Sequence, residues 1–219
     1  MYRIYSTEGI VLKSTDTGEA SKFLSLFTKD LGLLSARVQG IRKESSKLRY
    51  HVQDFSCASW NLVRGKNGWR VTSAYDAEIL AEAPAFRLRS EGARKEAMRM
   101  FLRTRDLLER LLHGEREESQ LFSDVVAALS ALKKDAVPED ALKDFEALFV
   151  MRILSRLGYW GEDPVLAPFL TSFNIDEPHT FSVFRPKKWK QFRTVLQKYA
   201  SLRKKKLNCQ IRRFFFTSG

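Results

Sequence analysis

Apolar and polar residues alternate with a period of two in several short runs before residue 81, which is the pattern of β-strands with one buried face. In the run 33–39 one of the polar positions is charged, Arg37, and this side chain is expected to face outward. Turn residues separate the runs, and Asn67-Gly68 can supply the positive φ angles of a tight hairpin. The pattern predicts five strands, at residues 10–12, 23–28, 33–39, 55–63 and 69–80.

The connection between the third and fourth predicted strands, residues 41–51, is polar and basic. It has four Lys or Arg side chains against one acid, Glu44. Five short strands with a basic loop at this place are typical of an OB-fold barrel, an all-β fold whose outer face binds oligonucleotides. We therefore expect an N-terminal OB-fold, nucleic-acid-binding domain at residues 1–82.

After the strand region the apolar period lengthens to three or four residues, as in amphipathic helices. Ser90 can cap the first helix, which Gly114 ends, and a second helix follows Ser119. A third helix is expected between Pro138 and Gly158, and it is apolar around most of its circumference. These three helices predict an all-α domain after the barrel.

Residues 160–181 contain three prolines and no clear period, so they are expected to form an irregular link. After Pro186 a last helix separates apolar residues on one side from lysine and arginine on the other. The sequence therefore predicts two domains, the barrel at 1–82 and a helical domain at 83–219 that includes this link and the basic C-terminal helix.

Positive charge is concentrated at the end of the chain. The net charge is +12, and residues 182–219 alone hold 12 Lys or Arg residues and no acid. Residues 1–85 carry +3 and residues 86–181 carry −3, so the rest of the chain is balanced. This asymmetry favours a polyanionic partner, whose phosphates Lys and Arg would neutralise. The alternative is a basic helix that is merely solvated.

The candidates for phosphate contacts are basic residues of the third strand, of the loop after it and of the C-terminal tail. They are Arg37, Arg42, Lys43, Lys47, Arg49, Lys187, Lys190, Arg203, Lys204, Lys205 and Lys206. Two basic surfaces could hold two strands near each other, as annealing requires. The candidates for stacking on bases are the barrel aromatics Trp60, Trp69 and Tyr75. The alternative is that these rings fill the barrel interior.

Patterns of catalytic and metal sites are absent from the sequence. Cys57 and Cys209 are the only cysteines, and the three histidines are far apart, so no metal ligand set can be assembled. The chain has no phosphate loop, dinucleotide motif or nucleophile elbow. We therefore expect a binding protein without a cofactor. No apolar run reaches about 18 residues and no secretory signal follows Met1, so a soluble, cytoplasmic protein without membrane contact is expected.

Seven short motifs follow one another along the chain: Glu8-Gly9-Ile10-Val11-Leu12, Gly18-Glu19, Leu26-Phe27-Thr28, Leu31-Gly32, Gly40-Ile41-Arg42-Lys43, Ala77-Glu78-Ile79-Leu80 and the Leu154–Tyr159 corner. In this order they resemble the bacterial recombination mediator family RecO. The basic segment Leu202–Arg213 resembles the same family more weakly. The resemblance implies an N-terminal OB barrel and an all-helical C-terminal domain.

The resemblance also implies a role in DNA repair after DNA damage. RecO proteins bind single- and double-stranded DNA and anneal complementary strands. They engage the acidic tail of single-stranded DNA-binding protein, and with RecR they help to load the recombinase. Many members carry a four-cysteine zinc module after the Leu-Gly-Tyr corner, whereas residues 160–181 here contain no cysteine. The module is therefore absent or replaced by the proline-rich link.

An acidic peptide tail would need an apolar pocket edged with arginine. The candidates on the first and third helices are Arg99, Arg103, Arg110, Arg152 and Arg156. Alternatively, these arginines pair with Glu96, Asp106 and Glu109 at helical spacing.

Two other functions fit the same features. An RNA-binding or ribosome-associated OB-fold protein would share the barrel and the basic tail, because contacts to the 2′-hydroxyl cannot be read from sequence. A Mg²⁺-dependent nuclease would need carboxylates that converge on a metal, which the spacing of the acids does not predict.

Overall fold

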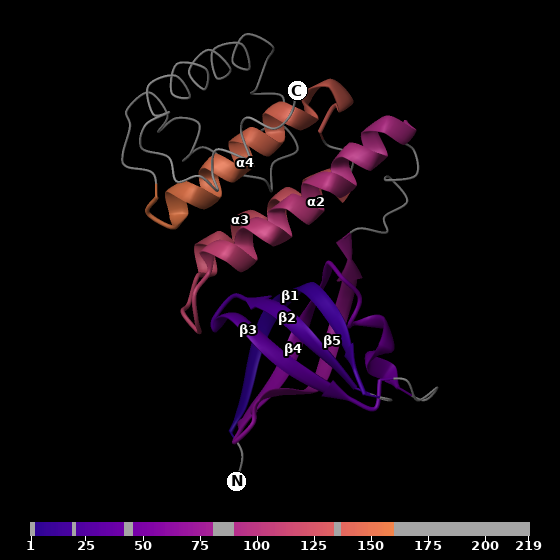
Figure 1. Ribbon diagram of the computed structural model, residues 1–219, viewed down its shortest axis with the longest axis vertical. Helices are drawn as coiled ribbons and strands as arrows, with labels where there is room; N and C mark the ends of the chain where they lie inside the picture. Colours follow the sequence, from indigo (N-terminus) through magenta and orange to yellow (C-terminus); the bar gives the residue numbers. More distant parts are fainter. Residues whose placement is uncertain (1–2, 19–20, 42–45, 81–89, 134–136, 160–219) are drawn as a thin grey trace. The chain divides into compact units, whose positions relative to one another are not determined.

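The computed structural model describes residues 3–18, 21–41, 46–80, 90–133 and 137–159 (Figure 1). The chain divides into two compact units, Met1–Asp135 and Ala136–Gly219, and each is described by itself. The first unit contains helices as well as strands, and the predicted domain boundary after residue 82 stays a prediction. The predicted link and the basic C-terminal helix lie outside the described residues.

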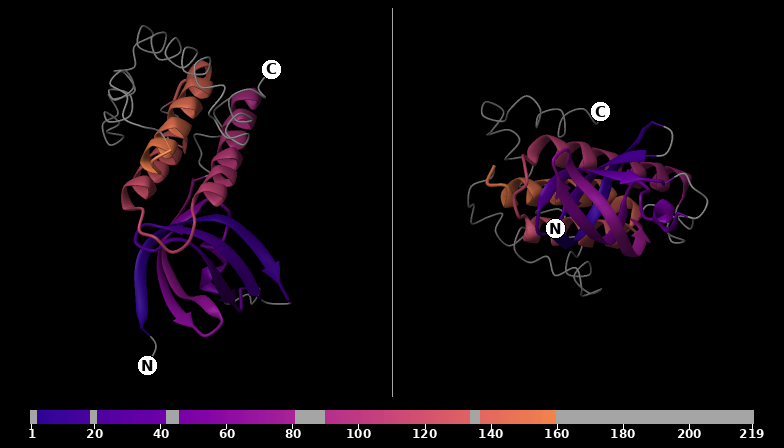
Figure 2. Two further views of the ribbon diagram at one scale, coloured as in Figure 1. Left: turned by 60° about the vertical axis from the view of Figure 1, so that its left-hand side comes forward. Right: turned by 90° about the horizontal axis from the view of Figure 1, so that it is seen from below.

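Five strands and one short 3₁₀ helix form the barrel of the first unit. The strands are β1 (Ile4–Thr17), β2 (Ser21–Thr28), β3 (Gly32–Gln39), β4 (Ser56–Gly65) and β5 (Gly68–Ile79), and η1 (Lys47–Tyr50) connects β3 to β4. They close in the order β1-β2-β3-β5-β4, and the views of Figure 2 show the strands wrapping around a common interior. Among the described strands, the parallel pair is β3 with β5. The predicted OB-type barrel is confirmed.

The first strand is much longer than the predicted run 10–12. Its first half pairs with β4, from Ile4 opposite Val63, and its second half pairs with β2, up to Thr17 opposite Ser21. The register shifts between Val11 and Lys13, which marks a β-bulge. The buried positions Thr7 and Gly9 are not apolar, residues 10–12 are all buried, and the bulge shifts the phase, so the sequence pattern predicted only the middle of the strand.

The barrel interior is a continuous apolar core that includes two tryptophans. Trp60 and Trp69 lie in it with Leu62 and Val71, their neighbours two positions along the same strands. The Trp60 Nε1–H group donates to the Gly9 carbonyl oxygen at 2.9 Å, so its polar atom is satisfied inside the barrel.

Two helices follow the barrel in the same unit, α2 (Glu91–Leu111) and α3 (Ser119–Lys133). The Ser90 Oγ accepts a hydrogen bond from the Ala93 N–H group at 3.2 Å, which confirms the predicted N-cap. Aromatic pairs hold both helices to the barrel. Phe101 of α2 packs edge-to-face on Phe55 at 5.1 Å, and Phe122 of α3 packs on Phe27 at 5.6 Å.

The loop between α2 and α3 also contacts the barrel. The Glu115 carboxylate accepts a hydrogen bond from Trp69 Nε1 at 2.8 Å and pairs with Arg64 Nη1 at 3.0 Å. The backbone of Arg116 lies directly against Gly32 at the start of β3. The barrel and its first two helices are therefore packed as one unit.

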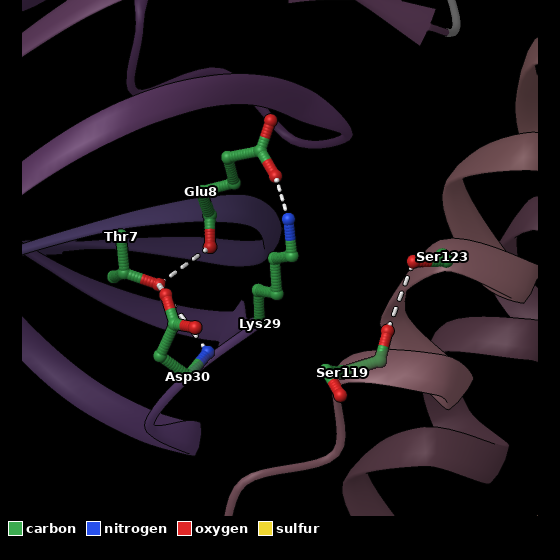
Figure 3. A network of polar contacts seen from close by, with 6 residues as sticks. All are labelled: Thr7, Glu8, Lys29, Asp30, Ser119 and Ser123. Carbon is green, nitrogen blue, oxygen red and sulfur yellow. Dashed lines mark hydrogen bonds and ion pairs between the residues drawn. The ribbon is translucent and has the colours of Figure 1, made fainter.

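The turn between β2 and β3 is fixed to the first strand by polar contacts (Figure 3). The Thr7 hydroxyl donates to the Asp30 carboxylate at 2.6 Å and accepts from the Asp30 N–H group at 3.3 Å. Lys29 Nζ and the Glu8 carboxylate pair at 2.9 Å in an exposed position. The same view shows the first turn of α3, where the Ser123 hydroxyl donates to the Ser119 carbonyl oxygen at 3.0 Å. The two-residue anchor at Thr7 and Asp30 holds the turn that presents Gly32.

The second unit is described from residue 137 to residue 159. A 3₁₀ turn, η3 (Glu139–Ala141), follows Pro138 and leads into α4 (Leu142–Arg156). Gly158 has a φ of 74° and ends the helix, as predicted. The buried residues of α4 lie on most of its circumference, which confirms the predicted apolar character. Among the described helices, none is long and apolar enough to cross a membrane.

Candidate nucleic-acid interface

One row of exposed side chains crosses four strands on the outer face of the barrel. Thr15 of β1 is the register partner of Phe23 of β2, and Phe23 is the partner of Arg37 of β3. Arg37 is in turn the partner of Arg70 of β5. All four residues are exposed, so their side chains leave the same face of the sheet. The row places an aromatic ring beside two arginines.

The alternation of each strand explains this row. Leu24 and Leu26 of β2 are buried in the barrel, so Phe23 points outward. The same rule turns Ala36 and Val38 of β3 inward and Arg37 outward. This outward position of Arg37 is the one predicted from the sequence.

Among the described residues, no carboxylate pairs with an arginine of the row. Arg37 Nη2 lies 3.5 Å from the Ser21 hydroxyl, a neutral partner. Within the described part of the chain, the Arg70 side chain makes no hydrogen bond or ion pair. Elsewhere on this unit, Lys29 and Arg103 each pair with a glutamate at 2.9 and 2.8 Å. The row therefore combines exposed positive charge with free hydrogen-bond donors, which is what a phosphate requires.

A polar groove of about 520 Å³ lies at the ends of β1 and β2, on the opposite face of the sheet from the row, and Arg49 lines it. Its lining residues Lys22 and Asp16 are register partners on the same face as the buried Leu24, with 3.4 Å between Lys22 Nζ and the Asp16 carboxylate. Arg49, in η1, is exposed and forms no ion pair with any described residue. Arg49 is thus an exposed cation at this groove, separate from the row.

Most of the other predicted phosphate contacts have no described position. Lys47 begins η1, but its side chain is not among the described ones. Six tail residues and two loop residues lie outside the described residues and stay predictions. They are Arg42, Lys43, Lys187, Lys190, Arg203, Lys204, Lys205 and Lys206.

Two of the three predicted stacking residues are wrong. Trp60 is 0% exposed and Trp69 is 6% exposed, because both rings point into the barrel, where a base cannot reach them. Tyr75 is 51% exposed and stays a candidate. Its hydroxyl group accepts from Asn61 Nδ2 at 3.0 Å and shares a hydrogen bond with Ser73 at 2.8 Å.

Sequence reasoning missed two residues of the row, Phe23 and Arg70. Phe23 lies one and three positions from Leu24 and Leu26, and an odd number of positions along a strand assigns it to the opposite, outer face. The signal for Arg70 was its position between Trp69 and Val71. Neither signal tells that the two residues lie in one row, because this depends on how the strands pair.

The arginines of the predicted peptide pocket occupy different environments. Glu96 pairs with Arg103 at 2.8 Å and with Arg99 at 3.3 Å, and these cations, Arg103 first, lower the pKa of the Glu96 carboxyl. The predicted alternative, pairing with Glu96, is therefore confirmed. Arg152 is only 5% exposed, so its assignment to an open pocket edge is wrong. Arg110 and Arg156 are exposed, and the pocket itself stays a prediction.

The described residues offer little for catalysis. Burial raises the pKa of the Cys57 thiol to about 11, and the carboxylates of Glu8 and Glu78 add to this shift. The thiol is therefore protonated near neutral pH and is a poor nucleophile. In the described ranges, no three His, Cys, Asp or Glu side chains are grouped so that they could hold a metal ion.

Comparison with known proteins agrees with the motifs in the sequence. Residues 1–80 match the family model described as Recombination protein O N terminal. A DNA repair protein RecO of Heliobacterium modesticaldum is 32% identical over 160 residues, which are 73% of this chain and 54% of the relative. The RecO protein of Rubrobacter xylanophilus is 28% identical over 71% of this chain and 58% of its own length. That of Alkaliphilus metalliredigens is 29% identical over 77% of this chain and 61% of its own length.

The chain thus spans little more than half of the length of these relatives. The matched region includes the whole barrel, with the row of Phe23, Arg37 and Arg70. The resemblance to RecO proteins that the sequence motifs predict is confirmed.

Proposed function

We propose that this chain, a relative of the RecO DNA repair proteins, binds single-stranded DNA on the outer face of its barrel and acts in recombinational DNA repair. The observation that carries the proposal is the pair of exposed arginines in one row, Arg37 and Arg70. Two features support it further: the OB-type barrel, whose second and third strands commonly bind oligonucleotides, and the exposed Arg49, which forms no ion pair with any described residue.

Binding of this kind is mainly electrostatic. Each phosphate that Lys or Arg neutralises releases counterions from the strand, and this release favours association at low salt. The contacts carry no sequence information, because they are made to the backbone and not to base edges. The proposed activity is therefore nearly independent of sequence.

The affinity for a single-stranded oligonucleotide is expected to fall steeply as salt rises. With three or four phosphate contacts at the barrel, log K should fall against log salt with a slope of about −2 to −3. Fluorescence anisotropy of a labelled deoxythymidine oligomer between about 50 and 200 mM salt measures this slope. Binding that is absent or insensitive to salt would contradict the proposal.

The same titration separates the alternative functions. An RNA oligomer of equal length should bind no more tightly than DNA, whereas a clear preference for RNA would favour an RNA-binding protein. Incubation of the labelled DNA with the protein and Mg²⁺ should leave the DNA intact. Cleavage that a chelator stops would favour the nuclease.

Strand annealing and recombinase loading are finer parts of the proposal. They rest on the resemblance to RecO proteins. The same resemblance is the basis for proposing three further partners: double-stranded DNA, RecR and the tail of single-stranded DNA-binding protein. Annealing would use the barrel face together with the basic cluster 203–206 as two strand-holding surfaces. A variant with that cluster neutralised is informative, since annealing at the wild-type rate would contradict a two-surface mechanism.

A further inference from the structure

Phe23 is an exposed aromatic ring in the middle of the candidate interface. Its side chain is 40% exposed, although it lies on the same strand as fully buried apolar residues. Phe27, four positions along β2, is buried and packs its ring on Phe122. The contrast shows that one phenylalanine of β2 is buried against α3, whereas the other remains partly exposed.

The surroundings of Phe23 are polar on every side in the sheet. Its neighbours on the same strand face are Ser21 and Ser25, and its partners on the adjacent strands are Thr15 and Arg37. Hydroxyl side chains are short, so they leave part of the ring exposed. The ring is therefore available on the surface, with the arginines of the row on one flank only.

The cations lie at a distance that suits one strand of nucleic acid. Neighbouring strands in a sheet are about 4.8 Å apart, which sets Arg37 about 5 Å and Arg70 about 10 Å from Phe23 along the row. A base on the ring and the phosphates next to it can be contacted together over such a span. A duplex offers its phosphates to the arginines, but its bases are already stacked inside and cannot reach the ring.

We propose that Phe23 stacks on an unpaired base of a single-stranded nucleic acid whose phosphates contact Arg37 and Arg70, and that this contact makes the barrel prefer single strands to duplexes. This inference rests on the proposed function of the same face. Stacking on an aromatic ring tolerates every base, because each base has a π-face. The Phe23 contact would therefore distinguish single strands from duplexes but would not distinguish one base sequence from another.

Tyr75 is the matched aromatic on another part of the barrel. It is exposed as well, but its hydroxyl group is engaged by Asn61 and Ser73. Its partner in the register is Ser59, which is itself opposite Glu8, an acid that would repel phosphate. No arginine is therefore among the described register partners of Tyr75, in contrast to Phe23.

The test compares variants of the whole chain by anisotropy with three probes: a deoxythymidine oligomer, a uridine oligomer and a blunt-ended DNA duplex without unpaired bases. Phe23→Ala should weaken binding of the single strands roughly 5- to 150-fold, the range for removal of one stacked base. It should change binding of the duplex less than about twofold, since no base reaches the ring. Phe23→Trp should retain the affinity, and Leu102→Ala, which shortens an exposed apolar side chain on α2, should leave it unchanged. Circular dichroism confirms that each variant is folded.

An unchanged affinity of Phe23→Ala, or an equal reduction on single strands and duplex, would overturn the stacking role. The charge-reversed variant Arg37→Glu/Arg70→Glu separates this result from failure of the proposed function. If that variant weakens binding while Phe23→Ala does not, only the stacking role fails. If neither substitution changes binding, the barrel face is not the DNA site. A reduction confined to the uridine oligomer would keep the stacking role and contradict DNA as the ligand.

Discussion

Replacement of Gly32 by alanine is expected to lower the free energy of unfolding by about 2–5 kcal/mol. Gly32 has a φ of 69°, a conformation that costs an L-residue about 1–2 kcal/mol. A Cβ atom there would lie 2.2 Å from the carbonyl oxygen of Arg116 and 2.9 Å from its nitrogen. Since both atoms are backbone, the 112–118 loop would have to move away from the barrel, and overpacking of this kind costs about 1–3 kcal/mol more.

Gly18 supplies the control for the backbone part of this cost. Its φ is 61°, and nothing lies within 4 Å of the position that a Cβ atom would occupy. Gly18→Ala should therefore cost only the conformational part, about 1 kcal/mol. Urea unfolding followed by tryptophan fluorescence measures both variants, because Trp60 and Trp69 are buried in the barrel. Equal destabilisation of the two variants would show that the loop does not press on β3.

The charge-reversed variant Arg37→Glu/Arg70→Glu is expected to bind single-stranded DNA about 100-fold more weakly at moderate salt. Each substitution removes one cation from the strand's path and places a negative charge near the phosphates. The salt slope should become shallower by about 0.7 for each phosphate that is no longer neutralised. An anisotropy titration at several salt concentrations gives both quantities.

A variant with the same change in net charge on α2 is the control for this result. Arg94 and Arg110 are exposed on that helix, away from the register of the row. Arg94→Glu/Arg110→Glu should reduce the affinity only a few-fold, because exposed charges beyond a Debye length of about 10 Å are screened. If both double variants bind equally weakly, net charge and not the barrel face governs binding.

Local patterns in the sequence were sufficient for most of the fold. Alternating residues and turn signals located β2 to β5, and the cap at Ser90 and the terminator at Gly158 fixed helix ends. These features depend on interactions between residues close in the chain. The extent of β1 was missed, because it depends on pairing with two different strands and contains a bulge near Leu12.

The candidate site was only partly predictable for the same reason. Arg37 could be assigned to the outer face from the alternation of β3 alone. Its proximity to Phe23 and Arg70 depends on the register of β2 and β5 against β3, which no local pattern encodes. Trp60 was misassigned as a stacking residue, although it shares its strand face with the buried Leu62. Whether an aromatic residue lies an even or an odd number of positions from a buried residue of its strand indicates its face better than its residue type does.

Photocross-linking would locate the DNA strand on the protein most directly. An oligomer that contains 5-iodouracil is bound to the full chain and irradiated, and the attached peptides are identified by mass spectrometry. Cross-links are predicted in β2 and β3, with Phe23 as the modified aromatic, whether or not the basic tail is also labelled. Cross-links confined to residues 182–219, with none in the barrel, would contradict a binding site on the outer face of the barrel.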